Sequence, residues 1–280
     1  MIGHFEQVRR AVAPSSAAPD VRSWLVPYGT TVEPGFRVVC FPHAGGSASY
    51  FAWLRAAVPP QGELLCVQYP GRQERRREPS IEQVPTMAAT VAEVLSGGPR
   101  TPLVLFGHSL GALLAFETAR ALEAGGRPVA GLIASGRRAP SVRPPQGGAD
   151  LSTEEIIAEM RVLGGVDPAL LNDPDVLELI LPVLRADHRL AESYVPEPGA
   201  AVSCPLTVLT GNSDPRVSWA DAQAWSGHTS GPCAVYEAEG GHFFFESDRP
   251  AVLGLIRDSL DSLRLTGMRA VPQRSLHEEQ

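Results

Sequence analysis

Lysine is absent from the 280-residue chain, and all 24 basic residues are arginines. Reactions that need a lysine amine, such as Schiff-base chemistry or phosphate binding by a P-loop, are therefore excluded. Acidic residues outnumber basic residues by 31 to 24, which gives a net charge of −7. A nucleic-acid-binding protein normally carries a basic excess, so we expect no nucleic-acid partner.

Cysteine is scarce, with four residues and no CxxC pair. Cys40, Cys66, Cys204 and Cys233 each lie in or beside a short apolar run that is typical of a buried strand. We expect free core thiols in a reducing cytoplasm. No stretch approaches about 18 continuous apolar residues, and the first ten residues lack the apolar segment of a signal peptide. The sequence therefore predicts a cytoplasmic protein that does not span a membrane.

Short apolar runs alternate with helical patterns along most of the chain, which indicates an α/β fold with a mostly parallel sheet covered by helices. The apolar content of 44% is enough to fill one sizeable core. The predicted strands are Phe36–Phe41, Leu64–Tyr69, Leu103–Phe106, Val129–Ser135, Leu206–Thr210 and Cys233–Glu237. The predicted helices lie near Tyr50–Val58, Ile81–Leu95, Leu110–Ala124, Trp219–Trp225 and Ala251–Leu263.

Residues 137–203 interrupt this alternation, because they contain two helical patterns and no good strand. The first helix is predicted to begin at Ser152, with Glu155 three residues later, as in a capping box. The second has Asp173 as its N-cap and Pro174 at its first position. A helical insertion on the side where loops build an active site is typical of a lid. The alternative is a packing extension with no catalytic role.

The expected organisation is one α/β core interrupted by this insertion. The core is predicted to consist of residues 21–136 and 204–265, with the helical insertion at 137–203 between them. Residues 1–20 and 266–280 are polar or contain proline and serine, and we expect them to be disordered.

A glycine-flanked serine directly follows one predicted strand. Gly107-His108-Ser109-Leu110-Gly111 lies between the strand Leu103–Phe106 and a helical run that begins at Leu110. A side chain at either glycine would collide with the neighbouring strand or helix, and the sharp turn holds the hydroxyl at the positive end of a helix. The pattern alone arises often by chance, but this strand, turn and helix are those of a nucleophile elbow. We predict Ser109 as the nucleophile.

A serine hydroxyl needs a base, and the elbow is followed along the chain first by an acid and then by a histidine. Among the histidines after Ser109, His228 and His242 are the two outside the insertion and the tail. His242 follows the strand Cys233–Glu237 through a Gly-Gly turn, which lets the loop fold back over the sheet edge, whereas His228 precedes that strand. We therefore predict His242 as the base.

An acid is needed to orient this histidine. Asp214 comes soon after the strand Leu206–Thr210, in a Gly-Asn-Ser-Asp-Pro turn. Parallel sheets place their sites at the carboxyl ends of the strands, so we predict Asp214 as the acid and keep Glu239 as the alternative acid. A turn-capping role is the alternative interpretation of Asp214.

Acyl transfer also needs hydrogen-bond donors for the oxyanion of the tetrahedral intermediate. The residue after the nucleophile supplies one, so we expect the amide of Leu110 to serve. The second is predicted to be the amide of Ala44, in the loop Phe41–Gly46, although a plain Gly-Gly turn would explain the same residues. The histidines and cysteines lack the spacing of metal ligands, and no metal or cofactor is expected.

Six motifs follow one another along the chain: FPHAGG at Phe41–Gly46, QYPGR at Gln68–Arg72, GHSLG at Gly107–Gly111, SGRRAP at Ser135–Pro140, LPVLRADHRLAESY at Leu181–Tyr194 and GGHFF at Gly240–Phe244. In this order they resemble the type II thioesterases that accompany modular polyketide synthases and nonribosomal peptide synthetases. The resemblance spans roughly residues 24 to 262. An ordered set of this kind is more specific than any single motif.

The resemblance implies an α/β-hydrolase fold with a helical lid over an acyl chamber. It implies a discrete editing hydrolase that removes acyl groups from the phosphopantetheine arm of acyl or peptidyl carrier domains. In that family the catalytic triad falls on Ser109, Asp214 and His242, and the oxyanion amides fall on Ala44 and Leu110. The implied partners are carrier domains of a polyketide synthase or nonribosomal peptide synthetase. We expect a monomer that needs no cofactor beyond the phosphopantetheine of its substrate.

The densest positive cluster in this acidic chain is formed by Arg72, Arg75, Arg76 and Arg77. Carrier domains are generally acidic, so one hypothesis places this cluster near the pantetheine entrance, where it would steer the partner. The alternative is a solvated loop whose arginines pair with neighbouring glutamates.

Two other functions stay open at this stage. A carboxylesterase or lipase could use the same scaffold, because fold and triad do not fix the leaving group. A non-catalytic carrier-binding protein could also keep the fold, although an intact triad argues against it.

Overall fold

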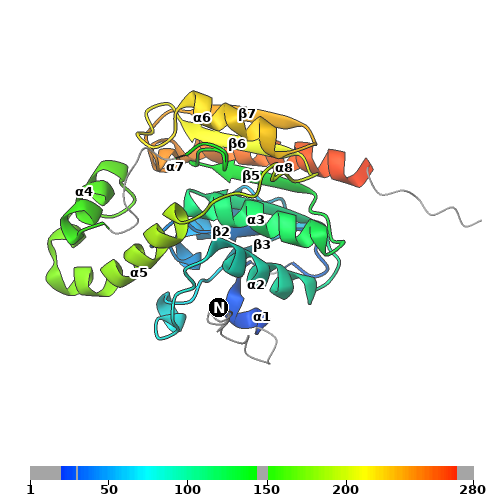
Figure 1. Cartoon of the computed structure of the whole chain (residues 1–280). Helices are drawn as coiled ribbons and strands as arrows, with labels where there is room; N and C mark the ends of the chain where they lie inside the picture. Colours follow the sequence, from blue (N-terminus) through cyan, green and yellow to red (C-terminus); the bar gives the residue numbers. More distant parts are fainter. Residues whose placement is uncertain (1–19, 30, 144–150, 270–280) are drawn as a thin grey trace, which may run out of the picture.

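A seven-stranded sheet forms the centre of the computed structural model, which describes residues 20–29, 31–143 and 151–269, with side chains up to residue 263. The strand order is β1-β3-β2-β4-β5-β6-β7 (Figure 1). The strands are β1 (Leu25–Tyr28), β2 (Phe36–Phe41), β3 (Gly62–Val67), β4 (Leu103–His108), β5 (Gly131–Ser135), β6 (Leu206–Gly211) and β7 (Cys233–Ala238). All neighbouring strands run parallel except β1, which is antiparallel to β3.

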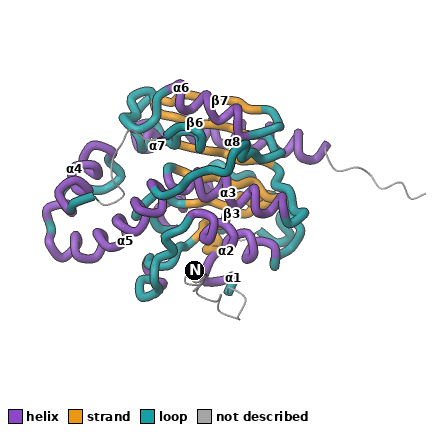
Figure 2. The backbone as a smooth tube through the Cα atoms, in the orientation of Figure 1, coloured by secondary structure: helices purple, strands orange, loops and turns teal. Residues whose placement is uncertain are grey.

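Helices cover both faces of this sheet (Figure 2). The α-helices are α1 (Val21–Trp24), α2 (Val84–Ser96), α3 (Leu110–Ala124), α4 (Thr153–Leu163), α5 (Pro174–Glu192), α6 (Trp219–Gln223), α7 (Phe244–Ser247) and α8 (Arg249–Arg269). The 3₁₀ helices are η1 (Ala48–Ala56), η2 (Gln73–Arg75), η3 (Leu170–Asn172) and η4 (Ala224–His228). Helices α2, α3 and α6 pack on one face, and η1, α7 and α8 pack on the other. The result is the three-layered α/β-hydrolase fold.

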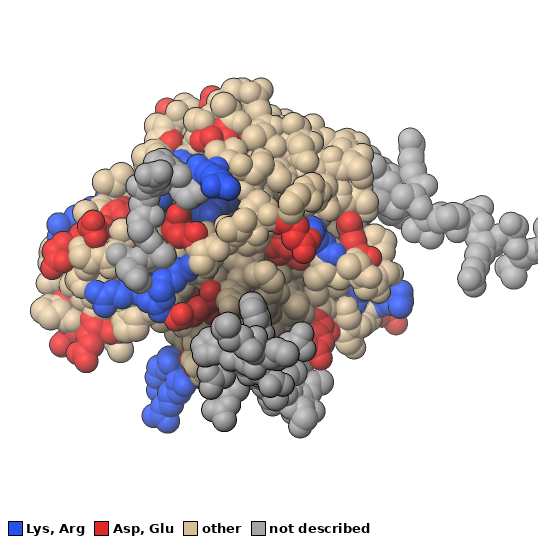
Figure 3. Space-filling model, viewed as in Figure 1, with Lys and Arg blue, Asp and Glu red and all other residues tan. Residues whose placement is uncertain are grey.

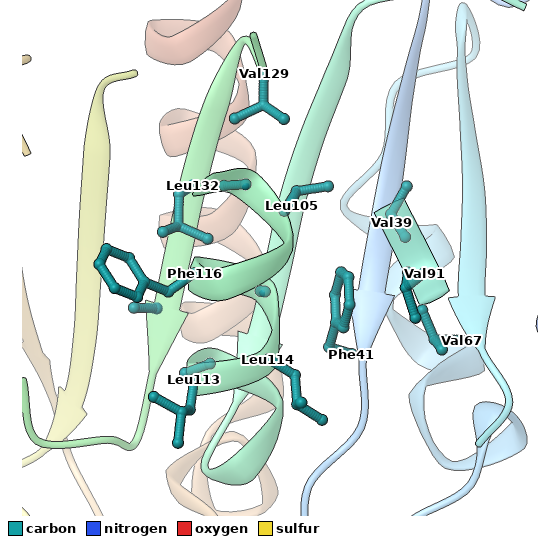
Figure 4. Packing of buried hydrophobic residues seen from close by; sticks show 14 of the residues in the cluster. Val39, Phe41, Val67, Val91, Leu105, Leu113, Leu114, Phe116, Val129 and Leu132 are labelled. Carbon is teal, nitrogen blue, oxygen red and sulfur yellow. The ribbon is translucent and has the colours of Figure 1, made fainter. Parts of the chain in front are cut away.

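Alternate residues of the central strands serve the two layers. In β2, Val39 and Phe41 belong to the cluster under α2 and α3, whereas Val38 and Cys40 belong to the cluster under η1 and α8. Successive side chains of a strand point to opposite faces, so strands buried on both sides read as continuous apolar runs. Figure 4 shows the first cluster, in which Phe116 of α3 packs with residues of the sheet.

All six strands predicted from the sequence are present, with ends shifted by at most two residues. The strand β1 is missed by the sequence analysis, because it has only four residues and contains Pro27. It lies at the sheet edge and pairs only with β3, where the missing amide of a proline is tolerated. The helix expected near Tyr50–Val58 is the 3₁₀ helix η1 and not an α-helix.

The insertion between β5 and β6 contains α4, η3 and α5, and it projects beyond the sheet at the left of Figure 1. Both predicted helix starts are confirmed. The Ser152 hydroxyl accepts from the Glu155 amide while the Glu155 carboxylate accepts from the Ser152 amide, and the Asp173 carboxylate accepts from the amides of residues 175 and 176. The domain limits drawn from the sequence stay a prediction. The expected disorder of residues 1–19 and 270–280 lies outside the described residues, but the expectation of disorder is wrong for residues 266–269, which form the end of helix α8.

All four cysteines are free thiols, as expected, and Cys40, Cys66 and Cys204 are buried. Cys233 in the outer strand β7 is half-buried. Burial raises the pKa of the Cys204 thiol to about 12, so this group stays protonated and behaves as a small apolar side chain. Within the described residues, no helix is long and apolar enough to cross a membrane.

Candidate active site

Ser109 lies at the turn between β4 and α3 with a positive φ of 55°, one of three positive-φ residues other than glycine in the described chain. Its amide donates to the Ser135 carbonyl oxygen of the adjacent strand at 2.8 Å, which ties the strained turn to the sheet. A Cβ atom on Gly107 would lie 2.5 Å from the Ala112 amide nitrogen, and one on Gly111 would lie 2.6 Å from the Phe41 carbonyl carbon. Both glycines are therefore required for the turn to exist.

His242 and Asp214 come from neighbouring loops after β7 and β6. The Nδ1 atom of His242 is 2.8 Å from Oδ2 of Asp214, and the two side chains are 4% and 0% exposed. The other carboxylate oxygen of Asp214 accepts from the Arg216 amide at 2.8 Å. Gly211 allows the loop that carries His242 to lie close to the end of β6. A Cβ atom on Gly211 would lie 3.1 Å from the Gly240 carbonyl carbon and closer still to the carbonyl oxygens of Gly240 and Gly241. The carboxylate is thus held in place to orient one imidazole.

The alternatives considered for the acid and the base lie elsewhere. Glu239 is exposed, and His242 contacts Asp214 instead. His228 is buried on the α3 side of the sheet, where Nδ1 is 2.7 Å from the Ala200 carbonyl oxygen and Nε2 is 2.9 Å from the Ser141 hydroxyl. Both of its ring nitrogens are engaged in structural hydrogen bonds.

Two further histidines, His43 and His108, lie near His242. Both precede Ser109 in the sequence, whereas the histidine base follows the nucleophile elbow along the chain, so neither is the expected base. The His108 ring lies 5.1 Å from the His242 ring, and the His43 ring lies 6.1 Å from the His108 ring. Burial, together with the neighbouring His242, lowers the pKa of His43 to about 3 and that of His108 well below its ordinary value. Both rings are therefore neutral at neutral pH, and the His108 Nδ1 atom shares a 2.9 Å hydrogen bond with the Ser135 hydroxyl.

Ser109 and His242 line one cavity of about 950 Å³, a volume that includes space open to solvent. The insertion forms much of its wall, with apolar side chains of α4 and α5. These are Ile156, Met160, Leu163, Leu184 and Ala191. An apolar chamber that contains a few polar groups beside a serine hydroxyl is suited to hold an acyl chain.

Charged side chains form the rest of this wall. Arg216 pairs with Glu159 of α4, and Arg138 pairs with Glu192 of α5 at 3.3 Å. Burial and the adjacent Arg138 lower the pKa of Arg137 to about 10, so its guanidinium is still charged at neutral pH. The Arg216–Glu159 pair therefore joins the insertion to the loop after β6, while the Arg138–Glu192 pair joins α5 to the first residues of the insertion.

The expected oxyanion residues Ala44 and Leu110 both line the same cavity. Leu110 is the first residue of α3, and amides in a first helical turn have no acceptor within their own helix. Ala44 lies in the Phe41–Gly46 loop, where Gly45 has a φ of 75° and the Gly46 amide donates to the His43 carbonyl oxygen at 2.9 Å. Both amides belong to elements that are rigidly held beside Ser109.

The arginine cluster differs from the sequence-based hypothesis. Arg72 and Arg75 are only 5% and 6% exposed, and both have internal partners, so they cannot form a surface that steers a carrier domain. Arg72 pairs with Asp187 of α5, while Arg75 stacks on the Trp24 ring at 4.2 Å and pairs with a glutamate three residues away. Arg76 and Arg77 are exposed in the loop after β3, and basic side chains project at this lower edge of the molecule (Figure 3).

Sequence reasoning missed Asp187 and Arg216, both of which line the cavity. Asp187 lies in a helical pattern whose other residues give no sign of a buried carboxylate, and its partner Arg72 is 115 positions away. In the part of the chain that the structure describes, no cluster of three or more histidine, cysteine or acidic residues could hold a metal ion.

Comparisons with known proteins show which family the chain resembles. A family model described as Thioesterase domain matches residues 36–260. The chain is 42% identical over 240 residues to "Thioesterase PikA5" of Streptomyces venezuelae, which covers 85% of each protein. It is 41% identical over 247 residues to "Probable cadicidin biosynthesis thioesterase" of Streptomyces griseus, covering 88% of this chain and 68% of the relative.

Solved structures give the same result. The type II thioesterase BorB from the borrelidin biosynthetic cluster matches with a TM-score of 0.77 and 42% identity, over 86% of this chain and 98% of that one. YbtT, a type II thioesterase from a yersiniabactin pathway, matches with a TM-score of 0.73 and 30% identity, over 89% of this chain and 100% of that one. The chain therefore belongs to the thioesterase family, among its type II members, and is a thioester hydrolase.

Proposed function

We propose that this thioesterase hydrolyses acyl groups from the phosphopantetheine arm of acyl or peptidyl carrier domains, and so edits stalled or aberrant intermediates of polyketide or nonribosomal peptide synthesis. The observation that carries the proposal is the shared cavity: Ser109 and the histidine held by Asp214 both line an apolar chamber under the helical insertion. The relatives whose names mention cadicidin biosynthesis and the yersiniabactin NRPS/PKS pathway support this class of substrate.

In the proposed mechanism, Ser109 attacks the thioester carbonyl carbon while Nε2 of His242 accepts the hydroxyl proton. Asp214, bound to Nδ1, fixes the tautomer and stabilises the imidazolium that forms. The amides of Ala44 and Leu110 donate to the oxyanion. The carbon–sulfur bond breaks, and the imidazolium gives its proton to the pantetheine thiolate, which leaves as the thiol. The neutral His242 then accepts a proton from a water molecule, which attacks the acyl-serine. The ester bond to Ser109 breaks, the serine oxygen takes this proton back from His242, and the free acid is released.

The helical insertion acts as the lid of the acyl chamber. Its apolar residues from α4 and α5 face the same cavity as Ser109, so an acyl chain bound there would contact the insertion. A chamber closed mainly by aliphatic side chains selects by size and shape more than by specific hydrogen bonds. This suits an editing enzyme that meets many different acyl groups.

The protein is proposed to work as a cytoplasmic monomer, with no metal or cofactor of its own.

The carrier partner is proposed to approach Arg76 and Arg77, which are exposed whereas Arg72 and Arg75 are not. Single charge reversals, Arg76→Glu and Arg77→Glu, should raise KM for an acyl-carrier protein about twofold to tenfold at low salt and leave turnover of a small acyl-pantetheine unchanged. Arg100→Glu is the matched control, because Arg100 is exposed just before β4, at the opposite end of the strands. Equal KM values for all three variants would reject this docking surface.

The central experiment incubates the protein with an acyl-loaded carrier domain and follows intact masses. We expect the carrier to lose its acyl group and Ser109 to carry a transient acyl adduct, with Ser109→Ala inactive in both respects. Matched small acyl thioesters and oxygen esters are assayed in parallel. Preference for the oxygen ester would favour a carboxylesterase, and turnover that does not depend on Ser109 would overturn the proposed mechanism.

A further inference from the structure

The lid helix α5 is joined to the Phe41–Gly46 loop by a buried carboxylate. Oδ2 of Asp187 accepts from the Gly45 amide at 2.7 Å and from Nη2 of Arg72. The Asp187 and Arg72 side chains are 8% and 5% exposed, so the pair is shielded from solvent and from salt. Burial raises the pKa of Asp187, and the Arg72 guanidinium and the Gly45 amide oppose this by favouring the ionised form.

Arg72 holds the same loop from its other side. Its Nε atom donates to the Gly46 carbonyl oxygen at 3.3 Å, and its Nη1 atom donates to the Pro70 carbonyl oxygen at 3.2 Å. The Asp187–Arg72 pair therefore forms hydrogen bonds with both the Gly45 amide and the Gly46 carbonyl oxygen of the Phe41–Gly46 loop. Breaking one member of such a buried pair leaves the other charge without compensation.

Apolar contacts reinforce this junction. A Cβ atom on Gly45 would lie 2.7 Å from Cδ2 of Leu184, and one on Gly71 would lie 3.8 Å from Cγ2 of Val183. Leu184 and Val183 belong to α5, so the lid helix packs directly on the backbone of the Phe41–Gly46 loop and of the loop after β3.

The hydrogen bonds of this loop fix the direction of the Ala44 amide. The His43 carbonyl oxygen accepts from the Gly46 amide at 2.9 Å, and since peptide groups are planar and trans, the Ala44 amide of the same peptide points the opposite way. The next peptide, between Ala44 and Gly45, is the one whose orientation distinguishes the common turn types. Asp187 accepts from the amide of that peptide and so prevents it from flipping.

We propose that Asp187 is a positioning residue for the hydrolysis: from the lid helix, its carboxylate locks the turn that presents the Ala44 amide to the oxyanion. This inference rests on the proposed function, because it assumes that Ala44 is an oxyanion donor. It also means that the oxyanion site is complete only while α5 is seated on the loop. The lid thereby contributes to transition-state stabilisation as well as to the shape of the chamber.

The test compares Asp187→Ala and Asp187→Asn with the wild-type enzyme on a small acyl-pantetheine thioester. Loss of a well-placed oxyanion donor costs about 10²- to 10³-fold in kcat, and a misplaced one costs less. We expect kcat to fall about 10- to 100-fold for Asp187→Ala, with KM within about twofold. Asp187→Asn keeps the shape of the side chain and carries the test if the alanine variant does not fold.

Two probes separate positioning from a general structural defect. An alkyl boronic acid forms a tetrahedral adduct on Ser109 with an oxygen in the oxyanion site, whereas a non-hydrolysable acyl-pantetheine thioether binds as the ground state. We expect the inhibition constant of the boronic acid to weaken in proportion to kcat, while the Kd of the thioether stays unchanged. A melting temperature is recorded for every variant.

The matched control is Glu82→Gln. Glu82 pairs with Arg189, which lies on α5 two residues after Asp187, and this ion pair is exposed on both sides. The control should keep wild-type kcat and boronic-acid affinity. Wild-type kcat in both Asp187 variants, or an equal loss of affinity for the boronic acid and the thioether, would overturn the inference. A wild-type enzyme without Ser109-dependent hydrolysis would instead overturn the proposed function itself.

Discussion

Replacing Gly111 with alanine tests how closely helix α3 must approach the Phe41–Gly46 loop. The new Cβ atom would lie 2.6 Å from the Phe41 carbonyl carbon and 2.7 Å from the Pro42 carbonyl oxygen. These are backbone atoms at the end of β2, so no side-chain rotation relieves the clash. The Phe41 carbonyl oxygen lies closer still, so the helix or the loop must shift by more than about 0.8 Å before every contact reaches the 3.4 Å of ordinary van der Waals distance.

Such a shift separates the two expected oxyanion amides, because Leu110 belongs to the helix and Ala44 to the loop. A misplacement of about 1 Å can cost about 100-fold in rate. We therefore expect Gly111→Ala to lower kcat/KM about 100-fold on a small acyl thioester. Overpacking should also lower the free energy of unfolding by about 1–3 kcal/mol.

Gly254→Ala is the matched control, because Gly254 lies within α8 and a Cβ atom there meets nothing within 4 Å. This variant should keep wild-type kcat/KM and gain about 0.5–1 kcal/mol of stability. Steady-state kinetics give kcat/KM for both variants, and urea unfolding gives their free energies of unfolding. A Gly111→Ala enzyme with kcat/KM within twofold of wild type would refute the steric argument.

Two further predictions concern the histidines. Asp214→Asn should lower kcat about 10⁴-fold, because the side-chain amide would stabilise the wrong tautomer of His242, and should change the unfolding free energy little. A loss of kcat below tenfold in steady-state assays would contradict this role of Asp214. The lowered pKa values of His43 and His108 mean that the unfolded chain binds more protons below about pH 6.5, so the unfolding free energy should fall between pH 7 and pH 5, by about 2 kcal/mol from His43 alone. His108→Asn should make that fall smaller, and urea unfolding curves with the same pH dependence as the wild-type protein would show that burial of His108 does not contribute to it.

The sequence predicts the parts of the site that depend on local chain geometry. Ser109 is recognisable because the elbow needs glycines two residues before and after it between a strand and a helix, and the structure places both glycines against backbone. Asp214 and His242 are recognisable because each follows a strand at its carboxyl end, and the parallel sheet brings those ends together. Their meeting at 2.8 Å follows from topology more than from any motif.

The sequence does not reveal contacts between segments far apart in the chain. Arg72 and Arg75 read as part of a basic surface run, yet Arg72 is neutralised by Asp187 and Arg75 is covered by Trp24. Asp187 and Trp24 are too far away in sequence to leave a pattern, and only the Arg75–Glu78 pair is local. The strand β1 is missed for a different reason, because a four-residue edge strand containing Pro27 has too few residues to show a period.

Electrostatics explains why a single histidine of this cluster can act as the base. His43, His108 and His242 lie within a few ångströms of one another, and three positive rings there would repel strongly. Burial, followed by the influence of the neighbouring rings, keeps His43 and His108 neutral, whereas His242 is the ring bound to a carboxylate. In the proposed mechanism, the imidazolium that forms on His242 is therefore stabilised by Asp214 and meets no like charge from the two histidines beside it. The apolar packing that buries those two rings thus favours the proposed chemistry.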